Sequence, residues 1–162
     1  MRFTTKTEYG LVCLINIAKH TLVSPEPVPI KDLVKDEGFS LAYTEKILQT
    51  LRAAKIVGSH QGHNGGYVLA RPAGEITLKE VVEALEGATF DVFCEPETRS
   101  EITCTHFPAC SIKPLWEKTK SLLDDFFGSI TLESLIKNPF AAVVARRDPS
   151  ALSEKAGGKH GS

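Results

Sequence analysis

The sequence predicts a mainly α-helical fold with one small β-hairpin. Apolar residues recur at helical spacing over residues 5–22 and again over residues 78–85. Between them, residues 38–67 give an amphipathic helix followed by two short extended runs around a glycine-rich reversal. A broad apolar stripe then covers residues 115–130. A helix followed by a hairpin is typical of a winged helix-turn-helix domain, and we expect the late stripe to form a long dimerisation helix.

The first half of the chain gives the elements of that domain in order. The first helix is expected over about residues 5–22, with Leu11, Leu14, Ile15, Ala18 and Leu22 on its inward face. A proline-punctuated connection at residues 24–29 leads to a short helix at 30–37. The hairpin is expected over residues 57–70, where Gly62, Gly65 and Gly66 permit a tight reversal with positive φ.

The helix before the hairpin carries the candidate binding residues. It begins at Ser40, whose hydroxyl can accept from the free amides of the first turn. Its expected inward face consists of Leu41, Ile47, Leu48 and Leu51. Its outward face is polar; such a face is often simply solvated, but before a hairpin it also suits the base edges of a DNA major groove. The predicted DNA-contact residues are Thr5, Lys6, Ser40, Ala42, Tyr43, Glu45, Lys46, Gln49, Arg52, Gln61, His63 and Asn64.

Charge is distributed unevenly along a chain whose net charge is only −1. Residues 1–72 hold nine Lys/Arg and six Asp/Glu, a net charge of +3, whereas residues 73–101 hold eight acids and two bases, a net charge of −6. This polarity fits a DNA-facing end and a separate sensor end. No apolar run approaches a membrane span and residues 1–20 do not resemble a signal peptide, so we expect a cytoplasmic protein without a membrane partner. No catalytic motif is present, which argues against an enzyme.

The four cysteines fall into two kinds. Cys13 stands alone among apolar residues and is expected to be a core thiol. Cys94, Cys104 and Cys110 lie within seventeen residues of one another, with His106 among them. The wide gaps suit a zinc site poorly, since structural zinc usually takes closely spaced cysteine pairs. An iron–sulfur cluster, zinc and a dithiol switch between Cys104 and Cys110 all remain open on spacing alone.

The second half of the chain divides around these cysteines. Thr77 and Glu80 form a capping box that opens a helix ending near residue 87. Residues 88–113, here called the cysteine segment, have no periodicity, and Pro114 then fits the start of the long helix, which could instead pack on the chain's own core. Thr131 is expected to cap a short last helix. The predicted divisions are a DNA-binding domain (1–87), a cluster-binding loop (88–113), the dimerisation and terminal helices (114–138) and a disordered tail (139–162).

Several motifs together resemble one family. They are Met1-Arg2-Phe3-Thr4 before Tyr9, Ser40 to Lys46, Gly65 to Leu69, the three spaced cysteines, Leu115-Trp116 and Ile130 to Leu132. Over residues 1–138 the chain resembles the IscR/NsrR-like family of iron–sulfur winged-helix transcriptional regulators. The resemblance implies a homodimeric repressor that binds a pseudo-palindromic operator in double-stranded DNA. It also implies a two-iron or four-iron cluster on the loop cysteines, sensing nitric oxide, redox state or iron–sulfur status.

Some positions depart from the family pattern. Lys113 stands three residues after the last cysteine, where some members place a histidine ligand, and the wing begins Gln61-Gly62 rather than Arg-Gly. Glu8 aligns with an acidic residue that NsrR-like members use as a ligand from the partner subunit, although a carboxylate in a first helical turn also has a structural role. His106 is a less favoured fourth ligand. The alternative reading is a winged-helix protein–protein interaction module that holds zinc or reactive thiols.

Overall fold

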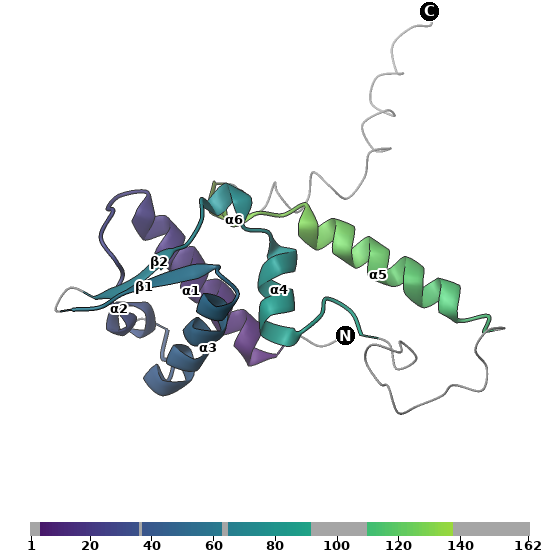
Figure 1. Ribbon diagram of the computed structural model, residues 1–162, viewed down its shortest axis with the longest axis horizontal. Coiled ribbons are helices and arrows are strands. Elements are labelled where there is room, and N and C mark those ends of the chain that lie inside the picture. Colours follow the sequence, from purple (N-terminus) through teal and green to yellow (C-terminus); the bar gives the residue numbers. More distant parts are fainter. Residues whose placement is uncertain (1–3, 36, 63–64, 92–109, 138–162) are drawn as a thin grey trace, which may run out of the picture.

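The computed structural model describes residues 4–35, 37–62, 65–91 and 110–137 (Figure 1). The elements follow in the order α1 (Thr5–Thr21), α2 (Ile30–Val34), α3 (Leu41–Ala53), β1 (Val57–His60), β2 (Gly66–Leu69), the short 3₁₀ helix η1 (Ala73–Glu75), α4 (Leu78–Glu86), α5 (Lys113–Gly128) and α6 (Leu132–Lys137). The predicted mainly helical fold with one antiparallel hairpin is confirmed. Its division into domains stays a prediction, because residues 92–109 and 138–162 lie outside the described residues.

The core lies where α1, α3 and α4 meet. Leu14 and Ile17 of α1, Leu48 and Leu51 of α3, and Val81 of α4 are all fully buried. The predicted inward residues Ile47, Leu48 and Leu51 of α3 and Val81, Val82 and Leu85 of α4 are buried. Leu22 was also expected on the inward face of α1, and this was wrong: it follows the last residue of that helix and is 68% exposed. α6 also packs on α1, and its Leu132 belongs to the same core. The last helix is therefore part of the same packed body as α1, α3 and α4 and not an extension of α5.

A third stretch of backbone pairs with the two strands of the hairpin, and the sequence did not suggest it. β1 pairs with β2 in the register Val57↔Leu69 to His60↔Gly66. On the other side of β2, Val28 and Tyr67 exchange two backbone hydrogen bonds of 2.9 and 2.8 Å. Val28 lies between Pro27 and Pro29, which lack an amide hydrogen, so it supplies the donor for this bridge. The proline-rich connection is thereby fixed against the wing, defined as residues 57–69.

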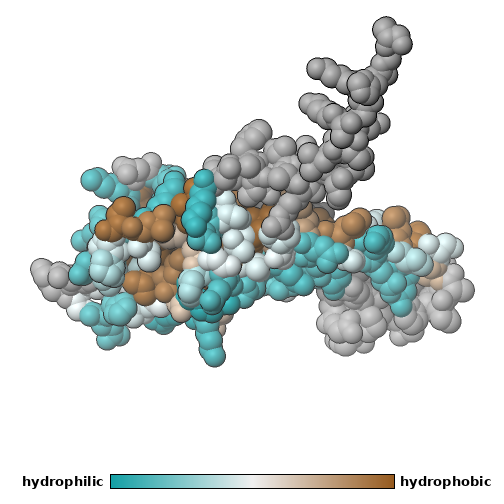
Figure 2. All heavy atoms as spheres, turned by 90° about the horizontal axis from the view of Figure 1, so that it is seen from above, coloured by the Kyte–Doolittle hydropathy of each residue, from teal (hydrophilic) through white to brown (hydrophobic). Residues whose placement is uncertain are grey.

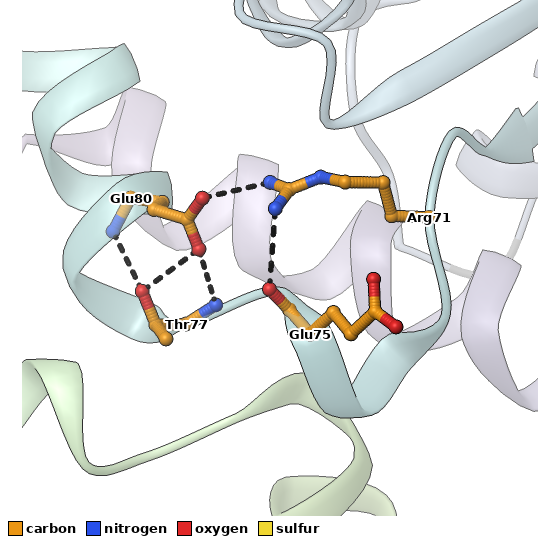
Figure 3. A network of polar contacts seen from close by, with 4 residues as sticks. All are labelled: Arg71, Glu75, Thr77 and Glu80. Carbon is orange, nitrogen blue, oxygen red and sulfur yellow. Dashed lines mark hydrogen bonds and ion pairs between the residues drawn. The ribbon is translucent and has the colours of Figure 1, made fainter.

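The wing and α4 are joined by a polar network around Arg71 (Figure 3). Its guanidinium forms a 2.8 Å ion pair with Glu80 and donates to the Glu75 backbone carbonyl at 3.3 Å. Glu80 also completes the predicted capping box with Thr77. Burial opposes ionisation of Glu80, but hydrogen bonds from Thr77 and Arg71 outweigh it and lower its pKa. This network fixes where α4 begins relative to the wing.

α5 projects from the body of the molecule (Figure 1). Its C-terminal end is held against α4, because Asp124 accepts a hydrogen bond from Thr89 and pairs with Lys79 at 3.3 Å. An antiparallel bridge between Thr77 and Thr131 fixes the chain after α5 to the start of α4. The projecting part carries exposed apolar side chains, seen as brown spheres along this helix in Figure 2. Among the large apolar side chains of α5, Leu115 is 59%, Trp116 37% and Leu122 57% exposed.

Candidate nucleic-acid interface and cysteine segment

Helix α3, which the sequence predicts to be the recognition helix, has one buried face and one polar face. Thr44, Ile47, Leu48 and Leu51 are buried, whereas the predicted contact residues on the other side are exposed. Leu41 was expected to lie inward, and this was wrong: its side chain is 43% exposed. It is the first residue of α3, about 10 Å along the axis from Leu48, and the core does not extend that far. The exposed side chains are Ser40, Leu41, Ala42, Tyr43, Glu45, Lys46, Gln49 and Arg52.

Aromatic rings from α1 support the start of the recognition helix. Tyr9 stacks on Phe39 with ring centroids 3.6 Å apart and an interplanar angle of 14°. It also meets Tyr43 edge-on at 5.8 Å. Ser40 occupies the N-cap position, but its side chain makes no capping hydrogen bond to any described residue. The orientation of this helix end is therefore set by aromatic packing rather than by the predicted serine cap.

A groove of about 440 Å³ separates the recognition helix from the wing. Glu45 and Arg52 line it from α3, and His60, Gln61 and Tyr67 line it from the wing. Arg52 donates to the Ser59 hydroxyl at 3.0 Å, which ties the helix to strand β1. The pKa of Tyr67 is raised, mainly by burial and then by the Glu45 carboxylate, against an opposing effect of Arg52. Polar groups of the helix and the wing thus share one concave surface.

The glycines of the wing serve two different purposes. Gly62 has a φ of +119°, a conformation that residues with a Cβ rarely adopt. Gly65 and Gly66 were also expected to have positive φ, and this was wrong. A Cβ on Gly66 would instead lie 2.5 Å from the Val28 carbonyl carbon, so this glycine permits the close approach of two backbones. His63 and Asn64, both predicted DNA contacts, lie outside the described residues.

The first turn of α1 interlocks with the last turn of α4. Thr4 donates to the Glu86 carboxylate from its amide at 3.1 Å and from its hydroxyl at 2.6 Å, and the buried Thr7 hydroxyl donates to the same oxygen. In return, the Lys6 ammonium donates to the Leu85 carbonyl at 2.7 Å. A carboxylate thus lies at a helix N-terminus and a cation at a helix C-terminus, as the helix dipoles favour.

This interlock bears on three predicted site residues. The Lys6 ammonium is already bound by α4, so any contact with DNA would compete with that hydrogen bond. Thr5 and Glu8 are exposed in the same helical turn. Sequence reasoning missed Glu86, since its partners Thr4 and Thr7 lie 82 and 79 residues away in the chain. Glu86 can be read from the sequence as an acidic residue at the end of a helix, but a single sequence does not indicate its hydrogen-bond partners.

The cysteines are only partly described. Cys13 is buried as predicted, and burial, helped by the Glu37 charge, raises its thiol pKa to about 11. Cys110 is half-buried and lies just before α5. Cys94, Cys104 and His106 lie outside the described residues, and within the described part no group of three potential metal ligands comes together. Lys113, at the position of the family's histidine ligand, forms a 3.4 Å ion pair with Glu117.

The two ends of the cysteine segment are held near each other. Phe90, four residues before Cys94, contacts the Trp116 ring of α5 at a centroid distance of 6.0 Å. Trp116 follows Cys110 by six residues. The first and last cysteines of the segment are thus only four and six residues in sequence from two side chains that are in contact. Three such donors, with carboxylates available, are a chemically suitable set for an iron–sulfur cluster.

Comparison with known proteins places these features in one family. A family model named Rrf2 and described as an iron-dependent transcriptional regulator matches residues 3–138. The chain is 33% identical over 150 residues to the HTH-type transcriptional regulator IscR of Xenorhabdus nematophila, covering 93% of this chain and 88% of that protein. It is also 33% identical over 138 residues to Protein rrf2 of Nitratidesulfovibrio vulgaris, covering 85% and 89%.

Solved structures agree with the sequence match. CymR, the global cysteine regulator of B. subtilis, superposes with a TM-score of 0.68 at 29% identity, covering 85% of this chain and 97% of that chain. T. potens IscR superposes with a TM-score of 0.65 at 27% identity, covering 94% and 96%. Among the described residues, no helix combines the length and apolarity needed to cross a membrane. The relatives are named as regulators and not as enzymes, in agreement with the sequence prediction. The chain belongs to the Rrf2 family of transcriptional regulators and is IscR-like.

Proposed function

We propose that this regulator is a cytoplasmic homodimeric repressor whose affinity for DNA is controlled by an iron–sulfur cluster on the cysteine segment. The observation that carries the proposal is the placement of α3. One face of this helix is buried, its start is supported by Tyr9, and its polar face is exposed beside the wing. Such an arrangement suits a helix lying in a major groove with a hairpin at the adjacent backbone.

The exposed side chains of α3 have distinct expected roles. Glu45 can accept from a cytosine amino group, and Gln49 can bond to an adenine edge. Lys46 suits a phosphate or a purine edge. Arg52 is bound to Ser59, so its contribution is to hold the wing at a fixed angle as well as to add positive charge. Ser40, Ala42 and Tyr43 stand at the helix start, where a recognition helix meets the bases, and Gln61, His63 and Asn64 would supply the wing contacts.

The exposed apolar face of α5 supports a homodimer. Leu115, Trp116 and Leu122 leave a long apolar surface in water on a projecting helix. Pairing two such helices around a two-fold axis would bury that surface and place two recognition helices on successive half-sites. The operator is then a pseudo-palindrome whose half-site centres are about 34 Å, or a multiple of it, apart. Leu122→Glu should yield a monomer in sedimentation, with Glu117→Lys, an exposed position on the opposite face of the same helix, as control.

The cluster proposal rests on the three thiols of the cysteine segment and on the contact between residues near its two ends. Cys94, Cys104 and Cys110 would supply three thiolates, and Glu8 of the partner subunit is the favoured fourth ligand over His106. A bound cluster supplies a group that reacts with oxidants and nitric oxide. The chain's own contribution is mechanical: the cysteine segment joins α4 to α5, so its conformation bears on the angle between the dimer helices and the recognition helices.

Binding to DNA is tested with matched lysine variants. Lys46→Ala should weaken operator binding by about three- to tenfold and reduce the salt dependence by about one phosphate contact. Lys137→Ala removes another exposed cation, on α6 and paired with Glu133, and should leave affinity unchanged. Fluorescence anisotropy against a selected operator gives both values. The regulator mechanism is wrong if neither the cluster-loaded nor the cluster-free protein shifts pooled genomic fragments.

Cluster binding has its own test. Anaerobically reconstituted protein should be brown and contain iron and sulfide, and Cys104→Ser should lose this absorption while keeping its helical content. Glu8→Ala should alter the spectrum and hasten cluster loss, whereas His106→Ala should be nearly normal. A colourless protein that contains zinc, and unfolds when Cys104 is replaced, would instead support the interaction-module alternative.

A further inference from the structure

A groove of about 630 Å³ lies at the C-terminal end of α1. It is bounded by the end of α1, the segment after β2, and α6. Leu22, Leu69, Pro72 and Ile136 give it an apolar lining. Leu22 is 68% exposed, so a large apolar side chain at the groove's edge faces water in the described part of the structure. A surface of this kind favours an apolar occupant.

The chain itself continues from the wall of this groove. Lys137, the last residue of α6, is among the lining residues. Asn138-Pro139 follows, a pair that ends helices and favours a turn. Residues 140–145 then read Phe-Ala-Ala-Val-Val-Ala, which is the apolar part of a polar C-terminal region. Six extended residues reach about 20 Å, enough to cross a groove that starts at their own anchor point.

The groove carries charged residues of both signs beside its apolar lining. The apolar run is followed at once by Arg146-Arg147. The groove contains Glu75, whose carboxylate is turned away from Glu80 in Figure 3 while its backbone carbonyl binds Arg71. Glu133 also lines the groove and forms an ion pair with Lys137. Arg71 and Lys137 also line the groove, so its two acids and two bases balance, and it is the apolar lining that matches the apolar segment.

We propose that residues 140–145 dock in this groove of their own chain, with Phe140 as the apolar anchor. The docked segment would hold α6 onto α1 and onto the return strand of the wing, and so stiffen the link between α5 and the DNA-binding body. Disorder would then begin only at Arg146. This inference does not depend on the cluster or on DNA binding.

Photo-crosslinking in the full-length chain tests the occupant. Phe140 is replaced with a benzoyl-phenylalanine, and isotopically light and heavy proteins are allowed to exchange subunits before irradiation. Adducts should join residue 140 to peptides containing Leu22 or residues 69–73 within one chain. Mixed light–heavy adducts in place of these would show that a second copy fills the groove. The proposal would also be overturned if residue 140 formed no adduct with peptides containing Leu22 or residues 69–73.

Two neighbouring apolar residues provide a matched control. Leu22 lines the groove, whereas Val23 is 83% exposed and is not among the lining residues. Leu22→Asp should lower the intrachain adduct yield about tenfold, the effect of losing one good apolar contact. Val23→Asp should leave the yield unchanged. Circular dichroism checks that both variants stay folded, and an equal effect of the two substitutions would refute docking at this groove.

Discussion

Glu86 is expected to contribute more to stability than its surface position suggests. In the Glu86→Ala variant, α1 loses the carboxylate that accepts from the Thr4 amide, a loss comparable to removing an N-cap at about 1 kcal/mol. The Thr7 hydroxyl, in a residue only 2% exposed, also loses its acceptor, at roughly 1–2 kcal/mol. The expected total is about 2–3 kcal/mol of unfolding free energy, or a fall in melting temperature of roughly 5–10 °C.

The pH dependence of the unfolding free energy isolates the part of the Glu86 contribution that comes from its negative charge. Burial opposes ionisation of Glu86, but hydrogen bonds from Thr4 and Thr7 prevail, so its pKa is lower in the folded state than in the unfolded chain. The ionised carboxylate therefore adds stability above the unfolded-state pKa, and this is lost as pH falls through the folded-state value. The unfolding free energies of wild type and Glu86→Gln should accordingly differ most near pH 7 and converge as the solution becomes acidic.

Thermal and urea unfolding followed by circular dichroism from pH 7 down to pH 3 measure both effects. Glu83→Ala is the matched control, since it removes a carboxylate from the same helix that pairs with Lys79 only at 3.7 Å. Such an exposed pair is worth less than about 0.5 kcal/mol. The reasoning is refuted if the Glu83 and Glu86 variants are equally stable, or if the gap between wild type and Glu86→Gln widens as pH falls.

Three other substitutions or reactions have definite expected outcomes. Gly66→Ala should cost about 1–3 kcal/mol in urea unfolding, because its Cβ would meet the Val28 carbonyl carbon at 2.5 Å, whereas Gly58→Ala should cost less. Lys55→Gly should stabilise the protein by about 0.5–1 kcal/mol, since Lys55 holds a left-handed φ of 58° at the end of α3. Cys13 should be the last thiol of the metal-free protein to alkylate at pH 8, because burial raises its pKa; rapid labelling would contradict the buried position.

Spacing in the sequence predicted the elements that depend on local periodicity. Ile47, Leu48 and Leu51 follow the 3.6-residue repeat and are buried, and the Thr77 capping box needs partners only three residues apart. Leu41 has the same periodicity but lies beyond the core, a fact that depends on where α1 and α4 end in space. Periodicity reports the face of a residue and not its height along the helix axis.

Contacts that join distant parts of the chain could not be predicted in this way. Val28 can bridge to Tyr67 because its backbone amide carries a hydrogen, which the neighbouring Pro27 and Pro29 lack. The sequence does not show this pairing, since Tyr67 lies 39 positions further along the chain. Arg52 was predicted as a DNA contact from its face alone, and its bond to Ser59 depends on the angle of the wing. The positive φ expected at Gly65 and Gly66 failed for a similar reason: glycine type indicates a special backbone requirement without saying which one.

The proposed control of DNA binding by the cysteine segment would act through the contacts at the segment's two ends. Its first end follows α4, whose last turn is bonded to α1 through Glu86 and Lys6. Its second end opens α5, which is held to α4 through Asp124. In the proposed mechanism, a conformational change between these ends would act on α1 or on α5, because polar contacts attach both helices to α4. α1 carries Tyr9, which supports the start of the recognition helix, so a shift of one helix would reach the DNA-binding face through direct packing.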